Sequence, residues 1–142
     1  MGGTATSHNL VLSTKYLVKK ILIIEDNTVT RKLIELTLEI DWYTVYQASN
    51  GEAGIQMTKD INPDLILLDI DMPGGISGLT VCDIIKSTPT LSHIPIIIVS
   101  GNSDEAYKVM LQNLGASEFI AKPFTPYGLL ETIQQHMPYD LT

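Results

Sequence analysis

Short hydrophobic runs in this 142-residue chain end beside side chains that could bind a divalent cation. The carboxylates are those of Glu25, Asp26, Asp69 and Asp71, and two further runs end beside Ser100 and Lys122. Carboxylates that converge repel one another, which raises their pKa values unless a cation neutralises them. Mg2+ is a suitable cation, because it takes oxygen ligands from one or two carboxylates and completes its shell with water and phosphate. If the ends of these runs meet, we expect an oxygen-only Mg2+ site with a lysine beside it.

Each of these residues also has a structural explanation when it is taken alone. Asp26 or Asn27 could cap a helix that begins at Thr28, because short polar side chains commonly cap helices. Ser100 could be a turn residue, and Lys122 could be an exposed surface cation. The chemical interpretation therefore depends on the convergence of several side chains and not on any one of them.

Zinc is not the expected metal, because the histidines and the single cysteine do not cluster. His8, His93 and His136 lie far apart and lack the spacing of zinc ligands. Cys82 cannot form an internal disulfide, and no N-terminal segment has the pattern of a signal peptide. These features favour a reducing, cytoplasmic compartment.

The elements that must position these residues alternate along the chain. Residues 20–25, 44–48, 64–69, 95–100 and 118–121 are short runs rich in Ile, Leu, Val, Tyr or Phe, and they predict five strands. Apolar residues at helical spacing between and after them predict five helices. The expected inner faces of these helices are Val29, Leu33, Leu36 and Ile40; Ala53 and Met57; Leu79, Cys82 and Ile85; Val109, Met110 and Leu114; and Leu130, Ile133 and Met137.

Strands that are apolar on both faces and alternate with helices predict an α/β fold, a doubly wound parallel sheet covered by helices on both sides. Ligands bind to such sheets beyond the carboxyl ends of the strands, where the strand order reverses. The candidate residues come from the ends of four strands, so this architecture brings them to one edge.

Length and charge limit the remaining possibilities. The chain is long enough for one compact domain and too short for two. We expect an N-terminal extension over residues 1–18, the domain over 19–138 and a C-terminal tail over 139–142. Sixteen acidic residues against nine basic ones give a formal charge of −7, which disfavours nucleic acid as a partner. The apolar runs are far shorter than the ~20 residues that span a bilayer, so no membrane segment is expected.

Four short motifs together resemble the receiver domain of two-component response regulators. They are Glu25-Asp26-Asn27, Asp69-Ile70-Asp71-Met72-Pro73, Ser100-Gly101 and Lys122-Pro123-Phe124. Their order and spacing agree with the family from about residue 20 to residue 137. The resemblance implies a five-stranded sheet of flavodoxin-like order 2-1-3-4-5. It also implies a phosphorelay signalling module that catalyses only its own phosphorylation and dephosphorylation.

The resemblance assigns a role to each residue of the acidic cluster. Asp69 would accept a phosphoryl group from a histidine kinase or a histidine phosphotransfer protein. Asp26 and Asp69 would bind Mg2+ directly, Glu25 mainly through a water, and Asp71 through its backbone carbonyl. Lys122 would pair with Asp69 before phosphorylation and with a phosphoryl oxygen afterwards.

The resemblance also implies a conformational switch. The hydroxyl of Ser100 would donate to a phosphoryl oxygen, and Phe119 matches the aromatic residue that moves into the vacated space. A cis peptide bond would join Lys122 and Pro123. The alternative for Phe119 is a ring of the core that does not move.

Two features depart from the common pattern of the family, besides the mild replacement of Thr by Ser at position 100. Residues 74–78 form a loop that is one residue longer than usual. Asp71 places a second carboxyl group two residues beyond the acceptor. It could alter metal affinity or the lifetime of the phosphoryl group, or it could face solvent.

Surplus apolar residues indicate where partners could dock. Ile34 and Leu38 lie off the expected inner face of the first helix, which in the family meets the phosphodonor. Tyr107 and Leu111 lie off the inner face of the fourth helix, near the surface that receivers use for effectors and dimers. A downstream effector protein or output domain, or a phosphorylation-dependent homodimer, would use the second patch.

Two functions from other classes use a similar architecture. A flavodoxin-like electron carrier is disfavoured, because Glu25 and Asp26 would repel the flavin phosphate. A Mg2+-dependent phosphohydrolase that forms an aspartyl-phosphate is also disfavoured. Such enzymes place the nucleophile after the first strand with a second Asp two residues later, and this chain has no such pair there.

Overall fold

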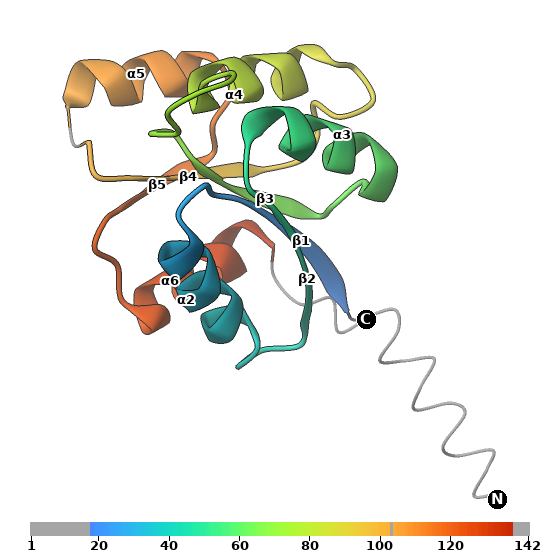
Figure 1. The fold of residues 1–142 in the computed structure, drawn as a ribbon, viewed down its shortest axis with the longest axis vertical. Helices are drawn as coiled ribbons and strands as arrows, with labels where there is room; N and C mark the ends of the chain where they lie inside the picture. Colours follow the sequence, from blue (N-terminus) through green and yellow to red (C-terminus); the bar gives the residue numbers. More distant parts are fainter. Residues whose placement is uncertain (1–17, 103, 138–142) are drawn as a thin grey trace, which may run out of the picture.

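The computed structural model describes residues 18–102 and 104–137, which form an α/β domain (Figure 1). In chain order the elements are β1 (Lys19–Ile24), α2 (Thr28–Leu38), β2 (Tyr43–Ala48), α3 (Gly51–Ile61), β3 (Leu65–Asp69), α4 (Gly78–Ser87), β4 (Ile96–Ser100), α5 (Glu105–Asn113), β5 (Glu118–Ala121) and α6 (Pro126–His136). The tail expected over 139–142 lies outside the described residues, as does the expected extension except for residue 18. The proposed limits of the domain therefore stay predictions.

The five strands of the described residues form one parallel sheet in the order β2-β1-β3-β4-β5. This confirms the predicted doubly wound sheet and its strand order. The predicted strand limits agree with the observed ones to within one residue at each end. The order reverses between β1 and β3, so the carboxyl ends of these two strands lie side by side.

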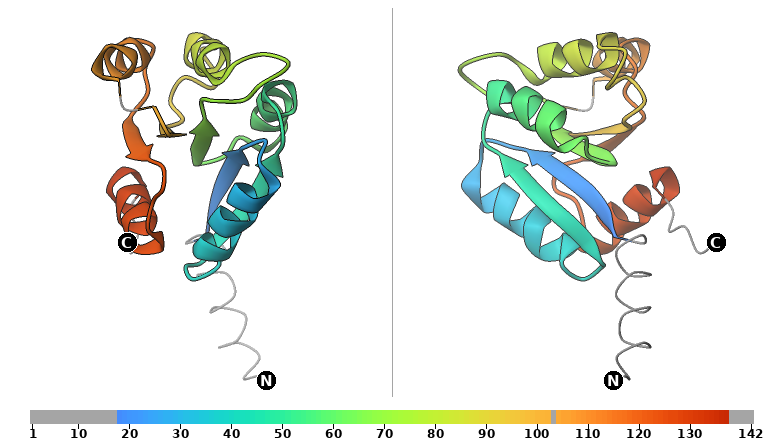
Figure 2. Two further views of the ribbon diagram at one scale, coloured as in Figure 1. Left: turned by 60° about the vertical axis from the view of Figure 1, so that its left-hand side comes forward. Right: turned by 90° about the vertical axis from the view of Figure 1, so that its right-hand side faces the viewer.

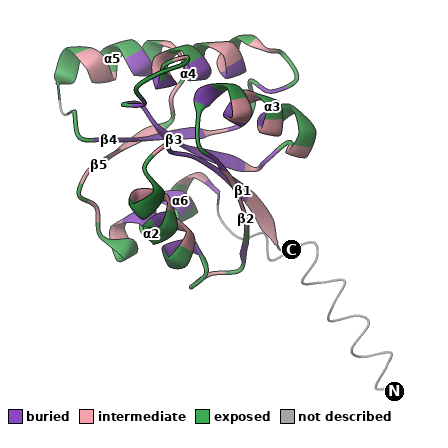
Figure 3. Cartoon of the chain, in the orientation of Figure 1, coloured by how far each residue is buried: buried purple, intermediate pink, exposed green. Residues whose placement is uncertain are grey.

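Alternate side chains of the strands enter two separate cores. Ile21 and Ile23 of β1 point toward α2 and α6, whereas Leu22 and Ile24 point toward α3, α4 and α5. Figure 2 shows the two groups of helices on opposite faces of the sheet. The strands β3 and β4 are buried along their whole length, as the purple central ribbons of Figure 3 show. This double burial explains their continuous apolar sequences.

The inner face of α2 differs from the prediction. Val29, Leu33, Leu36 and Ile40 were expected to pack on the sheet, but all four are exposed. Ile34 and Leu38, expected on the surface as a docking patch, are buried instead. The third buried residue of the helix is Thr37, whose hydroxyl donates to the Leu33 carbonyl at 2.8 Å. A threonine whose hydroxyl is hydrogen-bonded to its own helix can be buried like an apolar residue. A search for hydrophobic residues alone therefore does not find the helix face that contains Thr37.

The prediction for α5 is wrong for two of its three residues, whereas the third, Leu114, packs against the core. Val109 and Met110 were expected to face the core, but they are exposed. Leu111, expected near a docking surface, is buried, and Tyr107 packs against the same core. The predicted inner residues of α4 and α6 are confirmed, since Cys82, Ile85, Ile133 and Met137 are buried.

None of the helices in residues 18–102 and 104–137 combines the length and the apolar character needed to cross a lipid bilayer.

The two faces of α2 predict different costs for two similar substitutions. Ile34→Ala should lower the free energy of unfolding by about 2–5 kcal/mol, because it removes buried atoms and leaves a cavity. Leu36 is 50% exposed, so Leu36→Ala should change it by no more than about 0.5 kcal/mol. Urea unfolding of the two variants measures both values. Equal losses, or a larger loss for Leu36→Ala, would show that the helix packs on its hydrophobic stripe.

Candidate functional site

Three carboxylates meet at the carboxyl edge of the sheet. Glu25 and Asp26 directly follow β1, and Asp69 is the last residue of β3. Each offers one oxygen, and these oxygens all lie within 4.8 Å of one another. Glu25 and Asp69 are buried, whereas Asp26 is accessible to solvent. The predicted convergence of strand-end carboxylates is therefore present.

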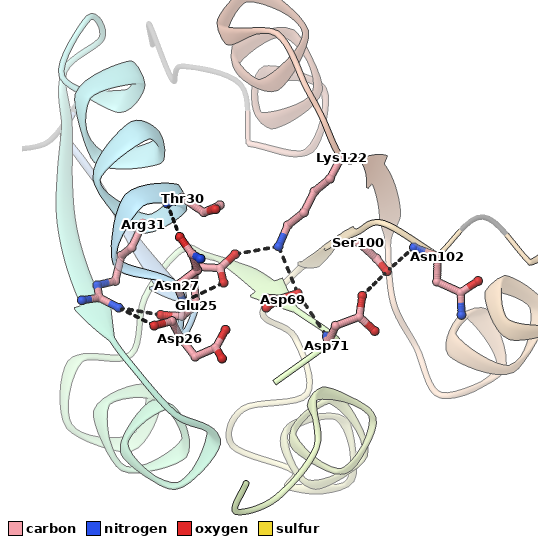
Figure 4. A network of polar contacts seen from close by, with 10 residues as sticks. All are labelled: Glu25, Asp26, Asn27, Thr30, Arg31, Asp69, Asp71, Ser100, Asn102 and Lys122. Atoms are coloured by element: carbon pink, nitrogen blue, oxygen red, sulfur yellow. Dashed lines mark hydrogen bonds and ion pairs between the residues drawn. The ribbon is translucent and has the colours of Figure 1, made fainter. Parts of the chain in front are cut away.

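The lysine after β5 reaches into this cluster. Lys122 Nζ lies 3.0 Å from Glu25 Oε1 and 3.3 Å from Asp69 Oδ1 (Figure 4). Its backbone N–H donates to the Ser100 carbonyl at 2.9 Å, which ties the lysine to the end of β4. The Lys122-Pro123 bond is cis, as the family resemblance implied. The pairing with Asp69 was expected, but the shorter contact with Glu25 was not.

Asn27 and Arg31 hold the turn after β1, so neither Glu25 nor Asp26 caps the helix that follows. Asn27 caps α2, and its side-chain oxygen accepts from the Thr30 N–H at 2.9 Å. Arg31 donates to the Glu25 carbonyl at 2.8 Å. No motif pointed to Arg31, although it is the only arginine in the sequence. Asp26 is thus excluded as the cap, and its side chain is available to a ligand.

The cluster carries more negative charge than its single lysine balances. Burial, with a smaller contribution from nearby Asp69, raises the pKa of Glu25 to about 7 against the opposing effect of the Lys122 hydrogen bond. Partial burial lowers the pKa of Lys122, but the contacts with Glu25 and Asp69 outweigh burial and raise the pKa overall. The site therefore favours bound protons or another cation.

Ser100 and Asp71 form the other side of the site. The Ser100 hydroxyl, at the end of β4, donates to Asp71 Oδ2 at 3.1 Å. Ser100 Oγ also accepts from the Asn102 N–H at 3.0 Å. The Asp71 backbone N–H donates to Asp69 Oδ1 at 3.1 Å. Asp71 is exposed, yet its carboxylate is engaged by Ser100.

Phe119 lies on β5 beside these residues. Its ring is half-buried and packs against the core on the side of α3, α4 and α5. It borders a cavity of about 120 Å3 that is lined by Ser100, Asn102, Lys108, Phe119, Ile120 and Ala121. The aromatic ring and the Ser100 hydroxyl therefore adjoin the same space.

The loop after Asp69 is shaped by glycines. Gly74 and Gly75 have φ values of +79° and +62°, which favour glycine. Gly78 begins α4 so close to the sheet that a Cβ atom would lie 2.7 Å from the Asp69 carbonyl oxygen. Gly78 therefore allows α4 to pack directly against the backbone of the acidic site.

A family model described as the response regulator receiver domain matches residues 21–134. The chain belongs to the receiver domain family. Response regulator PleD of Caulobacter vibrioides is 35% identical over 115 residues, which are 81% of this chain and 25% of PleD. Polar-differentiation response regulator DivK of Brucella anthropi is 31% identical over 119 residues, which are 84% of this chain and 96% of DivK.

A solved receiver structure agrees with this assignment. The CheY-like receiver domain protein of Methanospirillum hungatei JF-1 superposes with a TM-score of 0.76 at 29% identity, covering 83% of this chain and 92% of that one. The receiver chain thus spans a quarter of PleD but nearly all of DivK.

Membership of the receiver family indicates what kind of function this chain has. Receiver domains are phosphorelay signalling modules and not enzymes in the usual sense. The family binds Mg2+ at an acidic pocket, and Glu25, Asp26 and Asp69 form such a pocket here. Response regulators act with kinases and output effectors. A signalling role is therefore favoured over the electron carrier and the phosphohydrolase.

The raised pKa of Glu25 predicts that stability falls as the pH rises. A folded state that holds a proton more tightly than the unfolded chain is stabilised below pH 4.5, and this stabilisation is lost as the pH rises through about 7. In EDTA, the urea midpoint should be higher at about pH 5.5 than at about pH 8. Glu25→Gln should weaken this dependence, because the amide does not titrate. A parent midpoint that is equal or higher at the higher pH would contradict the assignment.

Proposed function

We propose that Asp69 is the phosphoacceptor of this receiver domain. The supporting observation is that a buried Asp69 carboxylate at the end of β3 lies 3.3 Å from Lys122 and within one acidic cluster with Glu25 and Asp26. An Asp69 oxygen attacks the phosphorus of a phosphohistidine, the P–N bond breaks, and the histidine nitrogen leaves and takes up a proton. The product is an aspartyl-phosphate on this chain.

A carboxylate is a weak nucleophile, so catalysis here depends on positioning and charge neutralisation. In the proposal, Lys122 shifts from its contacts with Glu25 and Asp69 to an oxygen of the transferred group. The Ser100 hydroxyl donates to another oxygen. The receiver thereby supplies the groups for its own phosphorylation and turns over no free substrate.

Mg2+ fits the donor set of the site. The carboxylates of Glu25, Asp26 and Asp69 and the backbone carbonyl of Asp71 offer oxygen only, which is the ligand type that Mg2+ prefers. When bound, the ion neutralises charge on the phosphoryl oxygens. Burial, and to a smaller extent the nearby Asp69 carboxylate, raises the pKa of Glu25, and a divalent cation at this position would offset both effects.

Phe119 is proposed as the switch residue that reports phosphorylation. Movement of Ser100 toward the phosphoryl group would open space beside the cavity that both residues border. Phe119 has no hydroxyl, so packing alone would decide which position its ring takes. The altered surface of β5 and α5 would then be read by a partner.

The exposed apolar stripe of α2 replaces the predicted Ile34–Leu38 patch as the docking surface for the phosphodonor. It consists of Val29, Leu33 and Leu36 of the helix and of Ile40, which lies just beyond the end of the helix. Leu33 also borders a cavity of about 340 Å3 together with Thr30, Lys122, Pro123 and Phe124. A histidine kinase or phosphotransfer protein seated on the stripe would therefore adjoin the acidic site.

Output is proposed to pass through α5, where Val109 and Met110 are exposed. A downstream effector, an output domain or a second phosphorylated copy would cover them. We also propose that the chain consists of an extension (1–18), a domain (19–138) and a tail (139–142). The protein is proposed to act in the cytoplasm.

Asp69→Asn should abolish labelling by acetyl phosphate in the presence of Mg2+, because it removes the nucleophilic oxygen. Intact mass should show one added phosphoryl group on the parent chain and on the control Asp60→Asn, whose side chain lies on the exposed surface of α3. Undiminished labelling of Asp69→Asn would overturn the assignment. Turnover of acetyl phosphate without labelling would instead indicate a phosphohydrolase.

Asp26→Asn should stabilise the protein in chelator, by about 1 kcal/mol, because it removes one charge from a crowded and partly solvated cluster. The urea midpoint measures this gain. Added Mg2+ should reduce or reverse the difference, because the parent chain binds the ion more tightly and is stabilised by it. A lower midpoint for Asp26→Asn in chelator would show that the carboxylates do not repel one another as proposed.

A further inference from the structure

The Ser100 hydroxyl is committed to Asp71 in this structure. A serine hydroxyl carries one proton, and that proton is donated to Asp71 Oδ2 at 3.1 Å (Figure 4). The lone pairs of Ser100 Oγ accept from the Asn102 N–H at 3.0 Å. Ser100 therefore cannot donate to a group on Asp69 until its bond to Asp71 breaks.

Asp71 is held in place from the acceptor side. Its backbone N–H donates to Asp69 Oδ1 at 3.1 Å, while its carboxylate accepts from Ser100. One residue thus links the end of β3 to the end of β4. Because it is exposed, Asp71 can be replaced without disturbing the core.

Further hydrogen bonds connect Ser100 to the start of α5. Asn102 donates its backbone N–H to Ser100, and its side-chain oxygen accepts from the Asp104 N–H at 2.9 Å. Asp104 is the N-cap of α5 and accepts from the Ala106 N–H at 3.0 Å. A hydrogen-bonded path therefore runs from Asp71 to the first turn of α5.

We propose that the hydrogen bond from the Ser100 hydroxyl to the Asp71 carboxylate, called the latch below, holds Ser100 in place while Asp69 is unphosphorylated. The strength of this bond sets how readily a phosphoryl group on Asp69 attracts the Ser100 hydroxyl and shifts the start of α5. This inference rests on the proposed function, because it takes Asp69 as the acceptor. Asp71 acts through Ser100 and is a positioning residue. The latch also gives a role to the second carboxyl group that departs from the family pattern.

The test measures the effect of Asp71→Ala in two backgrounds, the parent chain and the Ser100→Ala variant. Beryllofluoride, in the presence of Mg2+, serves as a stable mimic of the phosphoryl group. Titration calorimetry measures the affinity of each protein for beryllofluoride. Loss of the latch should tighten binding by about three- to tenfold when Ser100 is present, the size of one partly exposed hydrogen bond. It should have no comparable effect in Ser100→Ala, where no hydroxyl needs release.

The Asp71→Asn variant distinguishes the effect of the Asp71 charge from the effect of its hydrogen bond to Ser100. It removes the charge but keeps an acceptor oxygen in the same place. The latch predicts a smaller gain for Asp71→Asn than for Asp71→Ala. Equal gains for the two variants in both serine backgrounds would assign the effect to charge repulsion and overturn the latch. No gain for Asp71→Ala in the parent chain would overturn it as well.

A second readout follows the path to α5. In the amide NMR spectrum of the metal-free protein, Asp71→Ala should shift Asn102 and Ala106 toward their positions in the beryllofluoride complex. Unchanged Asn102 and Ala106 signals would contradict the latch. If Asp69→Asn binds beryllofluoride as tightly as the parent, the proposed function fails and the latch fails with it. Tight binding that depends on Asp69, without dependence on Ser100, disproves only the latch.

Discussion

The imbalance between clustered carboxylates and one ammonium group is the interaction on which the site depends. Glu25, Asp26 and Asp69 approach because β1 and β3 are paired neighbours that end at the same edge of the sheet. Lys122 contacts two of them but cannot neutralise three charges. A proton on Glu25 reduces the remaining charge, and a divalent cation would balance it, so the folded site would gain stability from a bound cation.

The sequence predicted the sheet better than the helices, for physical reasons. Strands buried on both faces are continuous apolar runs, and their ends mark the site, so the cluster at Glu25 and Asp69 could be inferred. The faces of α2 could not, because the buried Thr37 satisfies its own hydroxyl and because an exposed apolar stripe imitates a core face. The contacts of Arg31 and the Asp71–Ser100 bond depend on side-chain geometry that spacing does not encode.

Capping and chemistry are assigned to different residues at the same edge of the sheet. Asn27 and Asp104 cap the helices that follow β1 and β4, which leaves Asp26 and Ser100 free of that task. Arg31 fixes the turn after β1 through a backbone carbonyl and not through a carboxylate. The starts of α2 and α5 are therefore held by Asn27 and Asp104, while Ser100, Asp69 and Lys122 contact other polar groups of the site.

The helix α2 connects this chemistry to a surface. Its buried residues Ile34 and Leu38 anchor it to the sheet, and its N-terminal turn holds the backbone beside Glu25. Its outer stripe keeps large apolar side chains in water, which favours a covered surface in a complex. Leu33 joins that stripe to the cavity beside Lys122. A partner bound along α2 would therefore contact the same helix that holds the backbone of Glu25, so docking and phosphoryl transfer would both depend on the position of α2.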